Sequence, residues 1–218
     1  MGYEFDWSAV LDVKVWLSAM SVTLSYAVAT ITGGLLIGVL VGVAMLSRFW
    51  PLQAVAGGYV QFFRCTPLMV QIVWFYYALP IIAGFRVPAW LAGGLGLTLY
   101  MGAFCAEIFR AGVISIDKGQ WNAARSLGMS QFQMMRHIIL PQAARRMVPP
   151  FVNQSVLQLK NTSLLYVVAV PDLMYKSYEL AASTYRPLET YTAVAIIYFI
   201  ILYPLTKIAK RLEARADR

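Results

Sequence analysis

Charged residues are scarce in this sequence. Only 13% of its 218 residues are charged, whereas a soluble domain usually carries about a quarter. Stretches without Asp, Glu, Lys or Arg run over residues 15–47, 65–85, 87–106 and 190–206, and the stretch 147–171 contains only Lys160. A helix needs about 17–25 residues to cross the ~30 Å hydrocarbon core of a bilayer. The composition therefore excludes a soluble enzyme, a disulfide scaffold and a disordered chain, and it predicts a membrane protein with several spans.

Reactive residues and nucleotide-binding motifs are also lacking. The sequence has two cysteines and one histidine, and both cysteines fall at predicted span positions, where they are typical of small packing residues. An intramembrane enzyme would need a nucleophile with its base, or a metal-ligand cluster, and the spans contain neither. There is no G-x-x-x-x-G-K-[ST] loop, so nothing in the chain is expected to bind ATP. The sequence predicts no cofactor and no metal in this chain.

The net charge of +8 is distributed by topology. Predicted spans cover about residues 20–46, 66–84, 89–115, 150–170 and 189–207 within a membrane domain of residues 19–207. If the N-terminal segment 1–18 lies outside, the inner segments carry twelve Lys and Arg and the outer segments carry four. The positive-inside rule predicts this division. We therefore expect an all-α protein with five transmembrane helices, an outer N-terminus and a cytoplasmic basic tail at 208–218. The tail is attracted to anionic membrane lipid, and no nucleic acid is expected as a partner.

Small residues recur along the first span. Gly34, Gly38 and Gly42 are spaced four apart, so they lie on one helical face and allow a second backbone to approach closely. This pattern favours packing inside one bundle over a dimer interface. After the span, residues 47–64 are expected to run along the inner face of the membrane.

The longest polar segment, residues 117–146, is predicted to lie inside. Residues 119–127 suit a short helix, and Gly128 suits its C-terminal stop. Ser130 with Gln133 is a capping-box start for a second helix, which Pro141 ends or kinks. A DNA-binding helix-turn-helix is the alternative, but the segment has no third helix to form a core. Its apolar residues therefore indicate a protein-binding surface. They are Trp121, Leu127, Met129, Phe132, Met134 and Met135.

Polar side chains inside the spans are the candidate substrate contacts. Lys160 lies ten residues after Pro150, about 15 Å along a helix, near the bilayer midplane. An ionisable group at that depth is expected to face protein or a water-filled cavity. The segment from Lys160 through Asn161 and Thr162 to Ser163 is therefore predicted to line a pathway, together with Gln158. Gln154 is expected to make hydrogen bonds between helices.

Glu107 and Arg110 share one face of the third span, three residues apart. Two interpretations remain open for them. They neutralise each other, or Glu107 receives a cation, either a substrate ammonium group or Lys160 across a cavity. Gln71 on the second span is a further candidate for the pathway.

The inner loop resembles a known family. Asn122-Ala123-Ala124, three residues, Gly128, nine residues and then Ile138-Ile139-Leu140-Pro141 is similar to the EAA loop of ATP-binding cassette (ABC) importer permeases, with Asn122 in place of the usual Glu. Three further stretches resemble the polar amino acid branch of these permeases. They are Phe63-Arg64-Cys65-Thr66-Pro67-Leu68, Ala106-Glu107-Ile108-Phe109-Arg110-Ala111-Gly112 and Leu159-Lys160-Asn161-Thr162-Ser163-Leu164.

The resemblance implies a transport subunit with the type I ABC importer transmembrane fold in a bacterial inner membrane, and not an enzyme. It implies a second permease subunit, identical or homologous, two ATPase subunits that bind ATP and Mg²⁺, and an amino acid binding protein, which the segment 172–189 would help to receive. The residues expected to couple to the ATPase are Trp121, Asn122, Ala123, Ala124, Arg125, Leu127, Gly128 and Met129. The alternative is a secondary carrier or channel, which is disfavoured because no internal repeat is visible.

Overall fold

The computed structural model describes residues 4–216, and every regular element in that range is helical. The α-helices are α1 (Val13–Met45), α2 (Trp50–Cys65), α3 (Leu68–Val73), α4 (Leu79–Ala83), α5 (Ala89–Ile114), α6 (Lys118–Ser126), α7 (Gln131–Met134), α8 (Leu140–Asn161), α9 (Leu173–Thr184) and α10 (Pro187–Ala216). Short 3-10 segments cover Trp7–Val10 and Thr162–Val168, and π-helical turns cover Trp74–Ala78 and Met135–Ile139. The ends of the predicted outer segment and basic tail, at 1–3 and 217–218, lie outside the described residues.

Within the described range, α1, α5 and α10 are each long and apolar enough to cross a membrane. Helix α2 together with Leu68–Ala83 passes the same test as a pair bent by 106°. Helix α8 is not among these spans, and it contains Arg145, Arg146 and Lys160. The all-α prediction is confirmed for the described residues, whereas the five crossings and the side of each terminus stay predictions.

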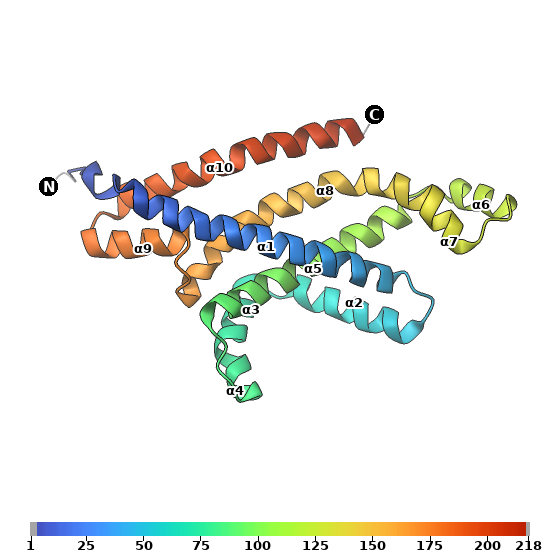
Figure 1. Ribbon diagram of the computed structural model, residues 1–218, viewed down its shortest axis with the longest axis horizontal. Coiled ribbons are helices and arrows are strands. Elements are labelled where there is room, and N and C mark those ends of the chain that lie inside the picture. The colour runs from blue at the N-terminus through green and yellow to red at the C-terminus, as the bar shows by residue number, and fades with distance from the viewer. Residues whose placement is uncertain (1–3, 217–218) are drawn as a thin grey trace.

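Helices α1 and α5 pack side by side in parallel (Figure 1). A Cβ atom placed on Gly34 would lie 2.3 Å from Met101, one on Gly38 would lie 2.3 Å from Cys105, and one on Gly42 would lie 2.8 Å from Phe109. The α1 glycines thus provide the space that α5 side chains occupy. The prediction that this ladder packs inside one bundle is confirmed.

The segment after α1 differs from the sequence-based expectation. Residues 47–64 do not run along the inner face, because α2 folds back and packs on α1 and α5. The Tyr59 hydroxyl donates a hydrogen bond of 2.6 Å to the carbonyl oxygen of Leu99, in the middle of α5. The apolar residues of α2 are therefore covered by the bundle. The chain then bends between α2 and α3, and α4 projects away from the long axis (Figure 1).

Helix α8 begins earlier than the predicted span at 150–170. Helix α7 runs through a π-helical turn into α8, so Pro141 stands in the first turn of α8 instead of ending a helix. The α-helix ends at Asn161 and a 3-10 segment follows, ending at Ala169, whose φ is 57°. Residues 160–163 therefore lie where the helix type changes.

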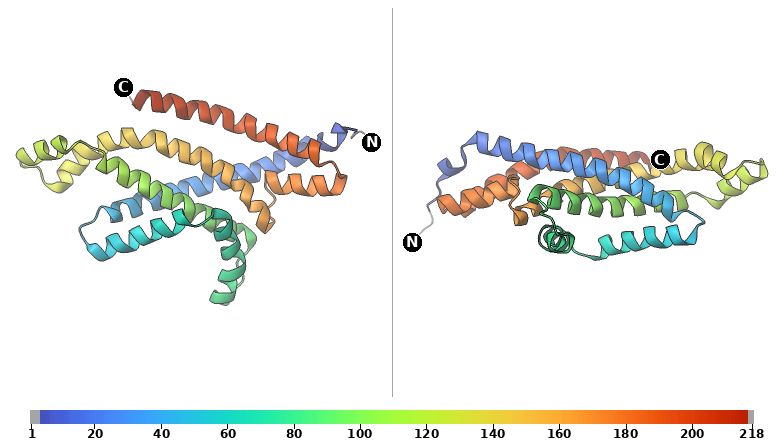
Figure 2. Two further views of the ribbon diagram at one scale, coloured as in Figure 1. Left: turned by 180° about the vertical axis from the view of Figure 1, so that it is seen from behind. Right: turned by 60° about the horizontal axis from the view of Figure 1, so that its bottom comes forward.

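The N-terminal segment, α9 and the start of α10 gather at one end of the molecule (Figure 2). The segment between Asp172 and Glu189, which is expected to help receive a binding protein, contains α9. Asp172 is fully buried and accepts a hydrogen bond from the backbone N–H of Tyr175 at 2.8 Å, and burial raises its pKa to about 6. Glu189 is also buried and accepts a bond from the backbone N–H of Asp6 at 2.9 Å. The first bond caps α9, and the second joins the N-terminal segment to α10. The backbone N–H of Leu173 donates to Thr23 Oγ1 at 3.0 Å, which joins the start of α9 to α1.

Candidate functional site

Helix α6 is closed at both ends by local hydrogen bonds. The side chain of Asp117 accepts from the backbone N–H of Gly119 at 2.6 Å. At the other end Gly128 has a φ of 73°, and the N–H of Met129 bonds to the carbonyl oxygen of Ala124 at 3.2 Å. This is a Schellman motif, which favours glycine at the left-handed position. The predicted helix and its glycine stop are confirmed.

The segment after α6 packs against the ends of two long helices. Ser130 and Gln133 form both bonds of the predicted capping box. Met134 is buried in a cluster that includes Val113 of α5 and Met147 of α8. The Arg146 guanidinium donates to the carbonyl oxygen of Ser115 at 2.6 Å. The loop that contains α6 and α7 is therefore fixed to α5 and α8.

Helix α6 itself is largely uncovered. Ala124 is its only buried residue, and Trp121 and Met129 are half-buried. The other expected coupling residues are exposed: Asn122, Ala123, Arg125, Leu127 and Gly128. Leu127 exposes 77% of its surface, so a leucine side chain at the tip of the loop has no cover in the monomer. Such an exposed apolar residue on a fixed helix is typical of a protein contact.

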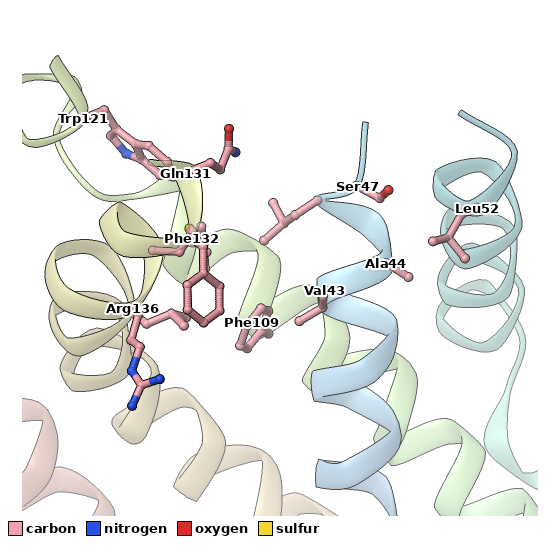
Figure 3. A pocket seen from close by; sticks show the side chains of 13 residues that line it. Val43, Ala44, Ser47, Leu52, Phe109, Trp121, Gln131, Phe132 and Arg136 are labelled. Carbon is pink, nitrogen blue, oxygen red and sulfur yellow. The ribbon is translucent and has the colours of Figure 1, made fainter. Parts of the chain in front are cut away.

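An apolar groove of about 590 Å³ lies between this loop and the ends of α1, α2 and α5 (Figure 3). Phe132 and Arg136 line it from the loop side, Val43 and Ala44 from α1, and Phe109 from α5. Phe132 is 69% exposed. The groove continues the uncovered surface of the loop toward the membrane-spanning helices.

Glu107 is the centre of an ion-pair network within the bundle. Arg110 binds both carboxylate oxygens, with Nη2 2.5 Å from Oε1 and Nε 3.1 Å from Oε2. Arg64 of α2 approaches the same carboxylate from another helix, its Nη1 3.7 Å from Oε2. The structure thus forms the mutual Glu107–Arg110 pair, one of the two interpretations left open by the sequence.

Arg64 is the residue that sequence reasoning missed. It was counted among the charges that fix orientation, because residues 47–64 were expected at the inner face. In the structure its guanidinium also lies 5.4 Å from the ring centroid of Phe104, on α5. The signal was available in the stretch Phe63–Leu68, which resembles amino acid permeases and begins next to Arg64.

The candidates from Lys160 to Ser163 divide into two groups. Lys160 is exposed, and Asn161 and Ser163 are half-buried. Among the residues that the structure describes, Lys160 makes no ion pair, and the buried Nδ2 of Asn161 has no hydrogen-bond partner. Thr162 is fully buried and donates to the carbonyl oxygen of Leu159. Ser163 makes a similar local bond, donating to the carbonyl oxygen of Lys160 at 2.8 Å. Lys160 and Asn161 thus keep polar groups without a partner among the described residues.

Two further candidates also face the core. Gln158 is fully buried, and its Nε2 donates to Thr30 Oγ1 at 3.1 Å and to the carbonyl oxygen of Leu97 at 2.9 Å, so it joins α8 to α1 and α5. Gln71 is buried at the bend after α2, where its Nε2 donates to the carbonyl oxygens of Phe63 and Thr66. It therefore closes the C-terminal end of α2. The Oε1 atom of each side chain is buried without a hydrogen-bond partner among the described residues.

This geometry defines a helical membrane subunit with a cluster of charges inside its bundle and an exposed helix on a fixed loop. No group of three or more potential metal ligands occurs among the described side chains. The chain belongs to the family described as "Binding-protein-dependent transport system inner membrane component", whose model matches residues 34–218. It is accordingly a transport component, and in this family the ATPase activity resides in separate subunits.

The relatives are similar over nearly their whole length. "Glutamine transport system permease protein GlnP" of Escherichia coli (strain K12) is 38% identical over 214 residues, 97% of this chain and 98% of that protein. "Arginine transport system permease protein ArtQ" of Bacillus subtilis (strain 168) is 33% identical, with 97% of each chain covered. A solved "amino acid ABC transporter with histidines" superimposes with a TM-score of 0.92 at 33% identity, covering 99% of this chain and 100% of that one. The fold is that of type I ABC importer permeases.

Proposed function

We propose that this chain is the permease subunit of an ATP-driven importer of a polar amino acid. It forms half of the translocation pathway, and a second permease, identical or homologous, forms the other half. The proposal is supported by the relatives, which are glutamine and arginine permeases, and by the solved amino acid transporter with the same fold. Membrane lipid surrounds the pair in the bacterial inner membrane.

The chain couples to a separate ATPase through α6. The observation that carries this step is that α6 has a single buried residue, Ala124, while the loop around it is fixed to α5 and α8. A partner that binds α6 therefore moves both long helices together with it. ATP and Mg²⁺ bind in the ATPase subunits, two for each pair of permeases, and the free energy of hydrolysis reaches the membrane through this contact.

The pathway side of the subunit carries the polar side chains that are not fully buried. They are Lys160, Asn161 and Ser163 at the end of α8 and the network of Arg64, Glu107 and Arg110. Gln71, Gln158 and Thr162, which the sequence predicts in the same set, are buried and bond within the bundle. Ionisable groups in a span are expected to face a water-filled cavity or protein, and a substrate route provides the cavity.

The amino acid is delivered to the permease at the end of the molecule opposite α6. Helix α9 and the N-terminal segment form a surface that the Leu173–Thr23 bond and the Asp6–Glu189 bond fix to the bundle. A periplasmic or surface-anchored binding protein docks on this surface and releases the amino acid above the pathway. The exposed Tyr178 and Glu179 of α9 are available for that contact.

The coupling step is tested with Gly128→Val and a deletion of residues 121–128. Valine at a φ of 73° disfavours the α6 stop, because left-handed backbone costs roughly 1–2 kcal/mol for a residue with a Cβ. We expect retention of the ATPase on affinity-tagged permease to fall about tenfold. Gly84→Val is the matched control, since Gly84 has a φ of 74° and a Cβ there meets nothing within 4 Å.

Equal ATPase retention by Gly128→Val, the deletion and Gly84→Val would contradict the coupling role of α6. Amino acid uptake by vesicles that contain the permease without any ATPase would replace the proposal by a secondary carrier.

A further inference from the structure

Carboxylates are almost missing from the helices of this chain. Between Asp12 and Asp172 the sequence contains only two acidic residues, Glu107 and Asp117. Asp117 caps α6 in the cytoplasmic loop. Glu107 is therefore the single carboxylate that the first four predicted spans can offer to a substrate.

That carboxylate is already neutralised. Arg110 contacts both of its oxygens and Arg64 approaches one of them at 3.7 Å. Two guanidinium groups thus share one carboxylate, which leaves the network with one positive charge in excess. The three side chains remain 23–36% exposed, so the network is accessible to a solute beside α5.

The network faces away from α1. Cys105 of α5 contacts Gly38 of α1, and Glu107 lies two residues further on, about 200° around the helix. Lys160 likewise lies on the side of α8 away from α1. Gln158 bonds to α1 and α5, and Lys160 follows Gln158 by two residues, so it lies on the other side of the helix. Both charged groups therefore project from the sides of α5 and α8 that α1 does not cover.

Lys160 adds a second positive charge. It is exposed and makes no ion pair with any described residue. Besides Glu107, Glu213 of α10 provides a carboxylate on that side, and it accepts a hydrogen bond from Asn153. Lys210 and Arg211 precede Glu213 by three and two residues. The uncovered side of α5, α8 and α10 thus has an excess of cations and no unpaired carboxylate among the described residues.

We propose that this pathway selects an anionic, dicarboxylic amino acid and rejects cationic amino acids. The inference rests on the proposed function and specifies its substrate class. A second carboxylate on the substrate pairs with Lys160 or with the excess charge of the arginine network, whereas the side chain of arginine or lysine meets only like charge. Neutral amino acids such as glutamine pass with intermediate preference.

Amino acid binding measured on the permease–ATPase complex without the binding protein tests this selection. The binding protein is left out because it has its own specificity. The probes are radiolabelled L-glutamate, L-glutamine and L-arginine. We expect glutamate to bind at least about tenfold more tightly than arginine. Lys160→Gln should weaken glutamate binding about tenfold and change glutamine binding much less. Lys207→Gln is the matched control, because Lys207 lies over the ring of Tyr203 on α10, and it should leave all three affinities unchanged.

A converse variant adds the missing charge. Asn161→Asp places a carboxylate next to Lys160, at a half-buried position whose amide has no partner. We expect it to shift the ratio of glutamate to arginine binding about tenfold toward arginine. Co-purification with the ATPase shows that each variant is folded.

Arginine binding as tight as glutamate binding, or no binding of any of the three probes, would overturn the selection. An unchanged glutamate affinity in Lys160→Gln would do the same. ATP-dependent uptake of arginine by the complete importer would refute the substrate class and leave the proposed function intact. Absence of ATP-dependent uptake of every amino acid would refute the proposed function itself.

Discussion

The contact between α1 and α5 depends on the absence of a side chain at Gly38. A Cβ atom at this position would lie 2.3 Å from Cys105 Cβ and 3.0 Å from the backbone nitrogen of Ala106. The second contact is with backbone, so no rotamer change relieves it. Gly38→Ala therefore requires the two helices to separate over part of their length.

The magnitude follows from two opposing effects. Overpacking a filled interface costs typically about 1–3 kcal/mol. Alanine also favours the helix over glycine by roughly 0.5–1 kcal/mol. We expect Gly38→Ala to lower the free energy of unfolding by about 1–2 kcal/mol, measured by equilibrium denaturation in mixed SDS and detergent micelles. Gly38→Leu should lower it further, because the added atoms meet the same backbone.

The control is Gly57→Ala on α2, where a Cβ would meet nothing within 4 Å. This variant gains the helix propensity of alanine without a clash, so it should be as stable as the wild type or slightly more stable. If Gly38→Ala proved as stable as Gly57→Ala, the close approach of α1 to α5 would not exist, and the packing described above would be wrong.

Three further predictions concern buried polar groups. Gln158→Met removes the bonds to Thr30 and to the Leu97 carbonyl, so we expect a loss of about 1–2 kcal/mol in unfolding free energy. Unlike Lys160→Gln, this variant should leave the ratio of glutamate to arginine binding unchanged. Gln71→Met leaves the carbonyl groups at the end of α2 without their donor and should cost about 1–3 kcal/mol in the same denaturation assay. The pKa of Asp172 is raised from 3.8 to about 6 in the folded state, so the folded state binds the proton more tightly and stability is lost as the pH rises through about 6. Asp172→Asn keeps the cap of α9, and a denaturation series against pH should show that this loss is absent in the variant.

Local signals in the sequence were sufficient to predict the loop that contains α6 and α7. The capping box of Ser130 and Gln133 and the stop at Gly128 depend only on bonds within a few residues, and both are formed as predicted. The ladder at Gly38 was also readable, because only close contact explains glycine at that spacing in a long apolar helix. These features need no knowledge of which helices are neighbours.

Other features depended on tertiary contacts. Residues 47–64 resemble an interfacial segment in composition, and only the contact of Tyr59 with α5 shows that α2 enters the bundle. That displacement also brings Arg64 to Glu107. Gln158 and Lys160 were assigned to one set because both are polar and close in sequence, but they lie on opposite faces of α8. The helical period separates them, yet it does not show which face the bundle covers.

The same contacts indicate which parts of the subunit move together. Gly38 and its neighbours lock α1 to α5, and Gln158 bonds α8 to both, so these three helices form one rigid unit. Helix α8 runs about 33 Å from the loop that contains α6 to Lys160, so the two polar ends of this unit are joined by one helix, which contains Pro149 and Pro150. Helix α2 is held to this unit at its far end by the exposed contact between Arg64 and Glu107, which is worth little compared with packed backbone. A displacement of α2 from this unit would therefore change the charge that Arg64 brings to Glu107.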